Sequence, residues 1–336
     1  MAKNKYPQVT NTVIKNLLKE AKKSGIQVKQ IDKRFLSFAL IYKDKTHYFF
    51  HKKIGINPTN SALVSNKFLT LKILEKTNIK VPKAFLTASL SEVKKLLKTK
   101  KIKYPFVIKP FDYSLGVAVT ANINDLATIK LAYSRLQRYW RKAKEWGKKK
   151  KKKLFMVEEY VTGNDYRILV LNNKVVAATQ RVYPQIIGDG KKTVKQLIKN
   201  FYQKHSYFKN KNKKPLIDKE LKRNLKLHNV EFDTVLDKGQ TIRLRQTSNV
   251  FGGGITINIT DKIHPFYKKI AIKACQKFNL NLAGVDLITK NISKKDDYSI
   301  IEINSFPALD MHENPDQGKD VNVSKLILQS IFPNLK

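Results

Sequence analysis

The sequence predicts a globular protein of the α/β or α+β class, in which strands and helices alternate along the chain. Apolar runs with the pattern of strands are interleaved with segments of helical periodicity, and we find no internal repeat. Hydrophobic residues make up 42% of the 336 residues, as in folded globular proteins. This length suffices for two or three subdomains, since one domain usually takes about 100–200 residues.

The first third of the chain is expected to contain helices on either side of two short strands. The expected elements are a basic amphipathic helix over 11–24, strands over 35–42 and 47–50, a helix over 61–77 and a short helix over 89–97. Asn57-Pro58 marks a turn before the second helix, and Ser61 is its expected N-cap. The apolar stripe of that helix is expected to consist of Leu63, Phe68, Leu71 and Leu74.

The same alternation continues to the C-terminus. The next expected elements are strands over 106–109 and 116–120, a helix over 124–146 and a strand over 154–160. Asn172-Asn173 separates apolar runs over 168–171 and 174–178, which is the signal of a two-residue hairpin turn. The remaining expected elements are helices within 193–228, broken near 209–214, strands over 242–245 and 255–259, a helix over 265–278, strands over 284–289 and 298–303, and a helix over 323–332.

The net charge of +41 is the most conspicuous feature of the composition. Such a charge suits nucleic acid, an anionic surface or an acidic polymer as a partner. Coding bias explains most of it better, because only nine of the 67 basic residues are Arg and the lysines are scattered without interleaved aromatic residues. Nucleic acid is therefore not the expected partner. The six lysines over 148–153 are expected to form a solvated loop, with docking of an anionic partner as the alternative.

The sequence also bears on location and redox chemistry. It contains no apolar run of about 18 or more residues, and the N-terminus lacks the apolar stretch of a signal peptide. The single cysteine, Cys275, excludes a disulfide within the chain and is expected to be a buried, inert thiol on the apolar face of a helix. These observations predict a cytoplasmic protein with no membrane partner.

Two apolar strands near the C-terminus carry the strongest chemical signal. Asp286 lies inside one strand, and Glu302 and Asn304 lie two residues apart in the next, so that these two side chains point to the same face. Acidic groups inside apolar strands are costly unless they are paired or bound to a metal. Three oxygen ligands on neighbouring strands suit Mg²⁺. The residues alone leave open that the acids face solvent, although the apolar flanks disfavour this.

Two further segments suit a nucleotide. Lys109 ends a strand and precedes a turn that reaches Gly116, so its ammonium can neutralise a phosphate. Glu158, Glu159 and Val161 lie where a strand turns into a loop that exposes backbone groups to an adenine edge, and an acid a few residues on suits ribose hydroxyls. Each signal is weak alone, and taken by itself the second is better explained by an ordinary strand-to-turn junction with solvated acids. The sequence has no P-loop or Rossmann motif.

The few arginines are informative in a chain that otherwise uses lysine, because Arg makes bidentate contacts to phosphate and carboxylate. The arginines beside these motifs are Arg167, Arg181, Arg243 and Arg245. Arg135, Arg138 and Arg141 lie on an expected helix and are predicted to face solvent. His264 and His312 are not spaced as a metal pair and have no Ser or Cys partner in the sequence.

Many separate blocks of the chain resemble one group of ATP-grasp ligases. They are SNKFLTLKILEKTNIKVPKA, YPFVIKP, GNDYRILVLNNKVVAATQRV, GDGKKTVKQLI, LRQTSNVFGGG, AGVDLI, IIEINSFPALDMH and GKDVNVSKLILQSIFP. That group contains the ATP-grasp half of cyanophycin synthetase and the glutathione synthetase half of the bifunctional glutathione synthetases. The resemblance covers about residues 61–333, in order and at plausible spacing.

The resemblance implies an ATP-grasp fold, in which two α+β subdomains clasp ATP, preceded by a small N-terminal domain. The expected parts are an α/β domain over 1–60, a helical linker subdomain over 61–102, a central ATP-grasp subdomain over 103–162, and a C-terminal one over 163–336 with an insertion at 188–249.

The resemblance also implies a role for each candidate residue. Phosphate contacts are expected from Lys67, Lys109 and Gly116, adenine contacts from the backbone of Glu159 and Val161 beside Glu158, and a ribose contact from Asp165. The expected ligands of Mg²⁺, with Mn²⁺ as the alternative metal, are Asp286, Glu302 and Asn304. Arg181 and Arg245 would stabilise the transferring phosphoryl group and the acyl phosphate, and the substrate would be positioned by Arg167, Asn249, Gly253 and Gly254.

The implied activity is ATP-dependent ligation of a carboxylate to an amine through an acyl phosphate. The carboxylate would belong to an amino acid, a peptide or an acidic polymer, and assembly into a homo-oligomer stays open. The chain lacks the second domain of either two-step synthetase, so it is not expected to complete either synthesis alone. The loop over 111–116 is about two residues shorter than the family's, with Ser114 in place of a usual Gly, and Phe251-Gly252 replaces a usual Ser-Thr. The altered loop over 111–116 and the lysine run over 148–153 motivate one alternative, a degenerate ATP-grasp binding module whose basic surface docks an anionic partner.

Overall fold

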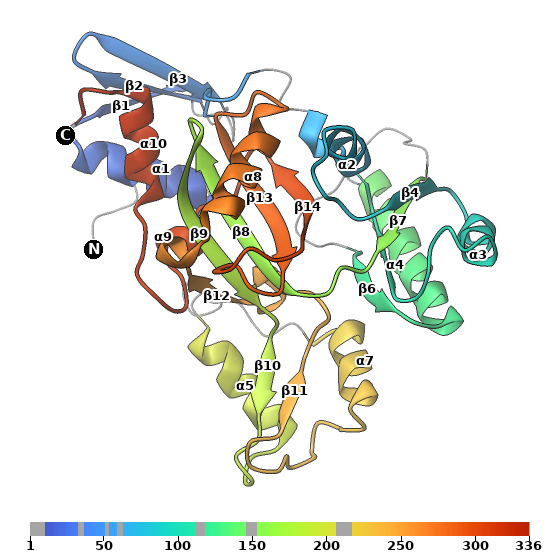
Figure 1. Cartoon of the computed structure of the whole chain (residues 1–336). Helices are drawn as coiled ribbons and strands as arrows, with labels where there is room; N and C mark the ends of the chain where they lie inside the picture. Colours follow the sequence, from blue (N-terminus) through green and yellow to red (C-terminus); the bar gives the residue numbers. More distant parts are fainter. Residues whose placement is uncertain are drawn as a thin grey trace.

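The computed structural model of the chain describes residues 11–32, 37–50, 54–58, 63–111, 118–145, 153–205 and 217–335. Strands and helices of the α+β class form four sheets around separate apolar cores, with the largest sheet in the middle (Figure 1). Every pairing between strands of these sheets is antiparallel.

The N-terminal unit is a helix on a three-stranded sheet. The helix is α1 (Thr12–Lys23), and the sheet has the order β1-β2-β3 with bounds Gln27–Asp32, Ser37–Tyr42 and Lys45–Phe50. Asn11 caps α1, because its side chain accepts a hydrogen bond from the Ile14 N–H at 3.2 Å. The apolar face of α1 packs against α10 (Val323–Ile331), so the two ends of the described chain share one core (Figure 1).

A second sheet, of order β4-β7-β5-β6, lies beside two helices. Its strands are β4 (Ala84–Thr87), β5 (Phe106–Lys109), β6 (Thr120–Ile123) and β7 (Phe155–Glu159), and the helices are α3 (Leu90–Lys98) and α4 (Leu126–Glu145). Apolar residues of β5 and β7 are fully buried against α3 and α4 in one core. This unit is joined to the central sheet through α2 (Lys67–Glu75), which lies against β14 and β4 (Figure 1).

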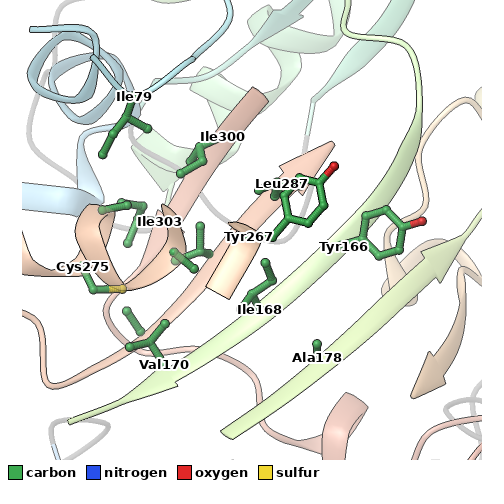
Figure 2. Packing of buried hydrophobic residues seen from close by; sticks show 14 of the residues in the cluster. Ile79, Tyr166, Ile168, Val170, Ala178, Tyr267, Cys275, Leu287, Ile300 and Ile303 are labelled. Atoms are coloured by element: carbon green, nitrogen blue, oxygen red, sulfur yellow. The ribbon is translucent and has the colours of Figure 1, made fainter. Parts of the chain in front are cut away.

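The central sheet has the order β12-β9-β8-β13-β14. Its strands are β8 (Asn164–Leu171), β9 (Lys174–Val182), β12 (Ile255–Asn258), β13 (Leu282–Thr289) and β14 (Tyr298–Asn304). One face is apolar and is covered by α8 (Pro265–Gln276), as Figure 2 shows for Ile168 and Val170 of β8 beside Cys275 of α8. The opposite face carries the candidate site.

A fourth unit projects from one end of the central sheet (Figure 1). It contains the ribbon β10-β11 (Gln185–Ile187 and Thr241–Arg243), α5 (Val194–Lys204) and α7 (Lys219–Leu227), which share a small core. Short helical turns complete the fold: η2 (Val250–Gly252), η3 (Thr260–Lys262) and α9 (Asp310–Glu313). No helix in the described ranges is long and apolar enough to cross a membrane.

Most expected elements are present within a few residues of their predicted bounds. The Asn172-Asn173 turn is confirmed, since both residues have positive φ, 45° and 59°, and β8 pairs with β9 around them. Sequence patterns missed β1, which is mostly polar, and the short strands β4 and β10, whose pairing partners are distant in sequence.

Two predicted boundaries are wrong. The helix predicted over 61–77 begins at Lys67, because Asn66 caps it through the Leu69 N–H; the predicted cap, Ser61, lies outside the described residues, and Leu63 is exposed. The strand predicted over 116–120 starts at Thr120, after a turn at Ala118 with φ of 56°. Residues 112–117 are not described, so the short loop and Gly116 have no structural account here.

Candidate active site

A row of polar residues crosses the face of the central sheet opposite α8. Glu302 of β14 lies directly opposite Asp286 of β13. Asp286 in turn lies opposite Arg167 of β8, and Arg167 lies opposite Thr179 of β9. Opposite residues of an antiparallel pair point to the same side, so these side chains form a contiguous row over four strands. Their neighbours along the strands point the other way, into the core beneath α8.

Asp286 is the buried anionic centre of this row. Arg167 donates to both of its oxygens, from Nε to Oδ1 and from Nη2 to Oδ2 at 3.0 Å. Nη2 of Arg181 lies 3.0 Å from the same Oδ2. Burial acts to raise the pKa of Asp286, but Arg167 and Arg181 outweigh it and hold the pKa at about 2. Asp286 is therefore ionised at neutral pH although only 3% of it is exposed.

Gly284 makes room for the arginine that pairs with Asp286. A Cβ at Gly284 would lie 2.8 Å from Cδ of Arg167 and 2.9 Å from Cβ of Pro307. Any side chain at this position would displace one of these neighbours. The glycine before Asp286 in the AGVDLI segment is thus a packing requirement of Arg167.

Lys67 and Asn304 complete the edge of the row at β14. Nζ of Lys67, the first residue of α2, forms an ion pair with Oε1 of Glu302, and only 8% of the lysine side chain is exposed. Nδ2 of Asn304 is buried and has no hydrogen-bond partner among the described residues. A side-chain amide with an unpartnered nitrogen can rotate to present its oxygen instead.

The three predicted metal ligands are close in the fold, and their chemistry fits a divalent cation. Asp286 and Glu302 face each other across β13 and β14, and Asn304 follows two residues later on the same side. Two carboxylates and one amide oxygen form the hard donor set that suits Mg²⁺ with water and phosphate in the remaining positions. Within the described ranges, no cluster of three or more His, Cys, Asp or Glu side chains offers a competing site.

Arg181 is held between two carboxylates. Its Nη2 donates to Oδ1 of Asp165 at 2.6 Å and lies 3.0 Å from Oδ2 of Asp286. Burial alone would lower the pKa of Arg181, but Asp165 and Asp286 raise it above its ordinary value. Its Nε is buried without an acceptor in the part of the chain that the structure describes, so one donor remains for a bound group.

The second sheet contributes a buried ion pair and a strand end. Lys109 of β5 and Glu158 of β7 are 2.7 Å apart, and Oε2 of Glu158 has no partner among the described residues. The backbone N–H of Glu159 donates to Lys83 O at 3.0 Å and its Oε2 accepts from the Lys83 N–H at 3.0 Å, which fixes the end of β7. Val161 follows on the short connection to β8.

A tight loop over 248–254 approaches the same centre. Ser248 Oγ donates to Oδ2 of Asp165. The Asn249 carbonyl accepts from the N–H groups of Gly252 and Gly254 at 2.9 and 3.0 Å, and a Cβ at Gly254 would lie 2.0 Å from Ser248 O. Gly253 has φ of 101°, a conformation that favours glycine. Sequence analysis singled out Asn249, Gly253 and Gly254 in this loop but missed Ser248.

The loop is supported from α5. Tyr202 OH donates to the Gly252 carbonyl at 3.2 Å, and Nε2 of His205 lies 2.9 Å from the Gly254 carbonyl. Both contacts come from the unit that projects from the central sheet. The position of the loop therefore depends on how that unit packs.

Arg245 lies at the border between the loop and α7. It donates from Nη2 and Nη1 to the two oxygens of Asp218 at 3.0 and 3.2 Å, and 5% of it is exposed. Asp218 also caps α7 through the Leu221 N–H at 3.0 Å. The contacts described for Arg245 do not include the Asp286 centre.

His312 of α9 is buried beside Thr179, at the β9 end of the row. Its Nδ1 is 2.7 Å from Oγ1 of Thr179, and its Nε2 has no partner among the described residues. Burial, then the charges of Arg167 and Arg181, lower the pKa of His312 to about 3. The imidazole is therefore neutral at physiological pH. His264, by contrast, caps α8 through the Phe266 N–H.

The prediction that Arg135 faces solvent is wrong. Its Nη1 donates to Glu220 Oε2 at 3.0 Å and to Thr120 Oγ1 at 3.1 Å, because α7 packs against this part of α4. Arg138 and Arg141 are exposed as predicted. Arg243 stacks on Tyr183, with the guanidinium carbon 3.9 Å from the ring centroid.

Comparison with protein families finds a match over this architecture. The RimK-like ATP-grasp domain matches residues 64–189 and 235–331, which contain every site residue predicted from the sequence. The stretch between these ranges contains α5 and α7.

Individual relatives agree with this match. Cyanophycin synthetase of Nostoc sp. (strain PCC 7120 / SAG 25.82 / UTEX 2576) is 30% identical over 330 residues, which cover 95% of this chain and 34% of that protein. The glutathione biosynthesis bifunctional protein GshAB of Clostridium perfringens (strain 13 / Type A) is 30% identical over 337 residues, or 94% of this chain and 40% of that protein. The crystal structure of a bifunctional glutathione synthetase from Pasteurella multocida has a TM-score of 0.66 at 25% identity, over 96% of this chain and 44% of that one. The chain thus spans less than half the length of these relatives.

Proposed function

The chain belongs to the RimK-like ATP-grasp family, and from this premise we propose that it is an ATP-dependent carboxylate–amine ligase. One observation carries the proposal. Asp286 is buried, ionised, directly opposite Glu302, and bracketed by Arg167 and Arg181. Burying a carboxylate with two guanidinium partners costs desolvation free energy that stability alone does not explain, and such groups cluster at functional sites.

The ATP would lie between the two larger sheets. Lys109 of β5 and Lys67 of α2 would neutralise its phosphates, and the backbone of Glu159 and Val161 at the end of β7 would hold the adenine. The ion pairs that these lysines form with Glu158 and Glu302 keep both ammonium groups in place before the nucleotide arrives.

Asp286, Glu302 and Asn304 would hold Mg²⁺, with Mn²⁺ as the alternative. The metal would neutralise charge on the β- and γ-phosphates. The cation would take over part of the role that Lys67 and the two arginines play as counter-ions of Glu302 and Asp286.

The reaction would take two balanced steps. A substrate carboxylate oxygen attacks the γ-phosphorus, the bond to the β–γ bridging oxygen breaks, and ADP leaves as an acyl phosphate forms. An amine nitrogen then attacks the acyl carbon, loses a proton and expels inorganic phosphate, which leaves an amide. Arg181, through its unpartnered Nε, and Arg245 would stabilise the transferring phosphoryl group and the acyl phosphate, and Arg167 would orient the substrate carboxylate.

The substrates belong to the same proposal. The relatives named above suggest an amino acid or a peptide as the carboxylate, and the loop at Asn249, Gly253 and Gly254 would position it. A cytoplasmic location, where ATP is available, and the division into subdomains over 1–60, 61–102, 103–162 and 163–336 are also part of this proposal. No contact of the described residues favours a degenerate binding module over the ligase.

The test is a screen of amino acids and dipeptides for ADP release with Mg-ATP. We expect ADP and phosphate in equal amounts, and only when both an acid and an amine are present. Asp286→Asn, which keeps the size of the side chain, should lower the rate by about 10²-fold or more, because it removes the negative charge that would face the metal and both arginines. Failure of the protein to bind ATP in the presence of Mg²⁺ would contradict the ligase proposal.

A further inference from the structure

We propose that Asp165 is the residue that positions Arg181, and that Ser248 holds Asp165 in place and so links the loop over 248–254 to that arginine. The family resemblance suggests a different role for Asp165, as a ribose ligand of ATP. The inference rests on the proposed function, since Arg181 acts on the transferring phosphoryl group only if the chain is a ligase.

The register of the sheet places the two residues as a pair. Asp165 of β8 lies directly opposite Arg181 of β9, and Oδ1 of Asp165 is 2.6 Å from Nη2 of Arg181. Side chains directly opposite in an antiparallel pair meet on one face of the sheet. The contact is therefore fixed by strand pairing.

Both oxygens of the Asp165 carboxylate are engaged within the chain. Oδ1 accepts from Arg181, Oδ2 accepts from Ser248 Oγ, and 8% of the residue is exposed. A ribose hydroxyl would have to approach a carboxylate whose two oxygens already accept hydrogen bonds from Arg181 and Ser248.

The consequence for Arg181 is a fixed orientation. One terminal nitrogen lies between Asp165 and Asp286, at 2.6 and 3.0 Å, while Nε has no acceptor among the described residues. A planar guanidinium held along one edge presents its other donors in fixed directions. Donors fixed before the reaction stabilise developing charge without having to reorganise. Asp165 would supply this orientation without touching a substrate.

Ser248 extends the link into the loop. Its carbonyl lies under Gly254, where an added Cβ would come within 2.0 Å, and its hydroxyl donates to Asp165. The loop cannot shift as a unit without moving this hydroxyl. We infer that a substrate seated against Asn249 and Gly253 acts on Arg181 through Ser248 and Asp165.

The two roles for Asp165 predict opposite results with 2′-deoxy-ATP. Asp165→Asn, Ser248→Ala and Ser248→Thr would be compared with wild type, and Asp297→Asn, which alters an exposed partner of Lys80, is the matched control. The measurements are ADP release and calorimetric binding, each with ATP and with 2′-deoxy-ATP.

For a positioning residue, Asp165→Asn should lower kcat by about 10–100-fold, because a displacement of roughly 1 Å can cost about 10²-fold. KM and Kd for ATP should stay within about threefold, and the preference for ATP over 2′-deoxy-ATP should equal that of the wild type. Ser248→Ala should lower kcat less, Ser248→Thr should recover it, and the effects of Ser248→Ala and Asp165→Asn should not add.

Loss of the preference for ATP in Asp165→Asn, with kcat unchanged, would overturn the inference and assign Asp165 to the ribose. A wild-type rate in Ser248→Ala would overturn the link to the loop. Because this variant removes only a hydroxyl, it still tests the proposal if Asp165→Asn does not fold. If the wild type binds ATP but releases no ADP, the ligase proposal fails, while the calorimetric comparison of the two nucleotides still decides whether Asp165 contacts ribose.

Discussion

Lys109 of β5 and Glu158 of β7 form an ion pair of 2.7 Å with 8% and 6% of their side chains exposed. The pair leaves one buried oxygen without a hydrogen bond, since Oε2 of Glu158 has no partner among the described residues. Buried ion pairs add little stability over apolar packing, so this one is better explained by a charge that must be ready for an anion.

Lys109→Met should therefore have two separable effects. It should weaken Mg-ATP binding by about 10-fold or more, because a phosphate loses its cation, and it should destabilise the fold by about 3–5 kcal/mol, because Glu158 is left buried and unpaired. The double variant Lys109→Met/Glu158→Gln should recover much of the stability without recovering affinity. Thermal unfolding without nucleotide and calorimetry with Mg-ATP measure the two effects. Wild-type affinity in the double variant would contradict a phosphate role for Lys109.

Gly284→Ala tests whether the glycine exists to accommodate Arg167. The new methyl group would lie 2.8 Å from Cδ of Arg167, so it should cost about 1–3 kcal/mol of stability and lower ADP release by displacing the partner of Asp286. In an Arg167→Ala background the same methyl meets fewer atoms. The stability penalty should shrink there, and an equal penalty in both backgrounds would show that Pro307 and not Arg167 is the obstacle.

The burial of Asp286 and its position beside Glu302 could be predicted from sequence, because an acid inside an apolar strand is a local and unusual pattern. The same holds for the Asn172-Asn173 turn, whose two residues favour positive φ wherever they occur. The ion pair between Lys67 and Glu302 could not be predicted from such patterns, since it joins residues 235 positions apart whose meeting depends on how α2 packs on β14.

The contacts of Ser248 and Arg135 could not be predicted from the local sequence. A serine in a loop carries no signal of its own, and only the packing of the loop on β8 brings Ser248 to Asp165. Arg135 has the sequence context of a surface arginine, and it is drawn into an ion pair because α7, more than 80 residues later, lies beside α4. The roles proposed for Asp165, Arg181 and Arg245 stay predictions, and the experiments above decide that of Asp165.

His312 should make the stability of the protein depend on pH. Its pKa is about 3 in the folded chain, against about 6.5 in an unfolded one. Between these values the unfolded state binds a proton that the folded state does not, so stability is fully present above about pH 6.5 and falls as the pH is lowered towards 3. The slope from this one group is at most about 1.4 kcal/mol per pH unit.

Urea unfolding at pH 7, 6 and 5 measures that slope. His312→Asn should reduce the slope by up to about 1.4 kcal/mol per pH unit, the contribution of one proton. His228→Asn, at an exposed histidine, is the matched control. Equal slopes in the wild type and both variants would contradict the buried, neutral state of His312.

Cys275 offers a probe of the core beneath the site. It is fully buried against the apolar face of the central sheet (Figure 2), and burial raises the pKa of its thiol to about 12. Because the thiolate is the reactive form, a disulfide reagent at pH 8 should label the folded chain only as fast as the core opens, and should label one thiol per chain at once in denaturant. Mg-ATP should slow native labelling further if it bridges the two sheets, since a ligand that binds only the folded state lowers the population of open ones. Labelling of the folded chain at the rate of a free thiol would contradict the burial of Cys275, and labelling unaffected by saturating Mg-ATP would show that ATP binding does not stabilise the core beneath α8.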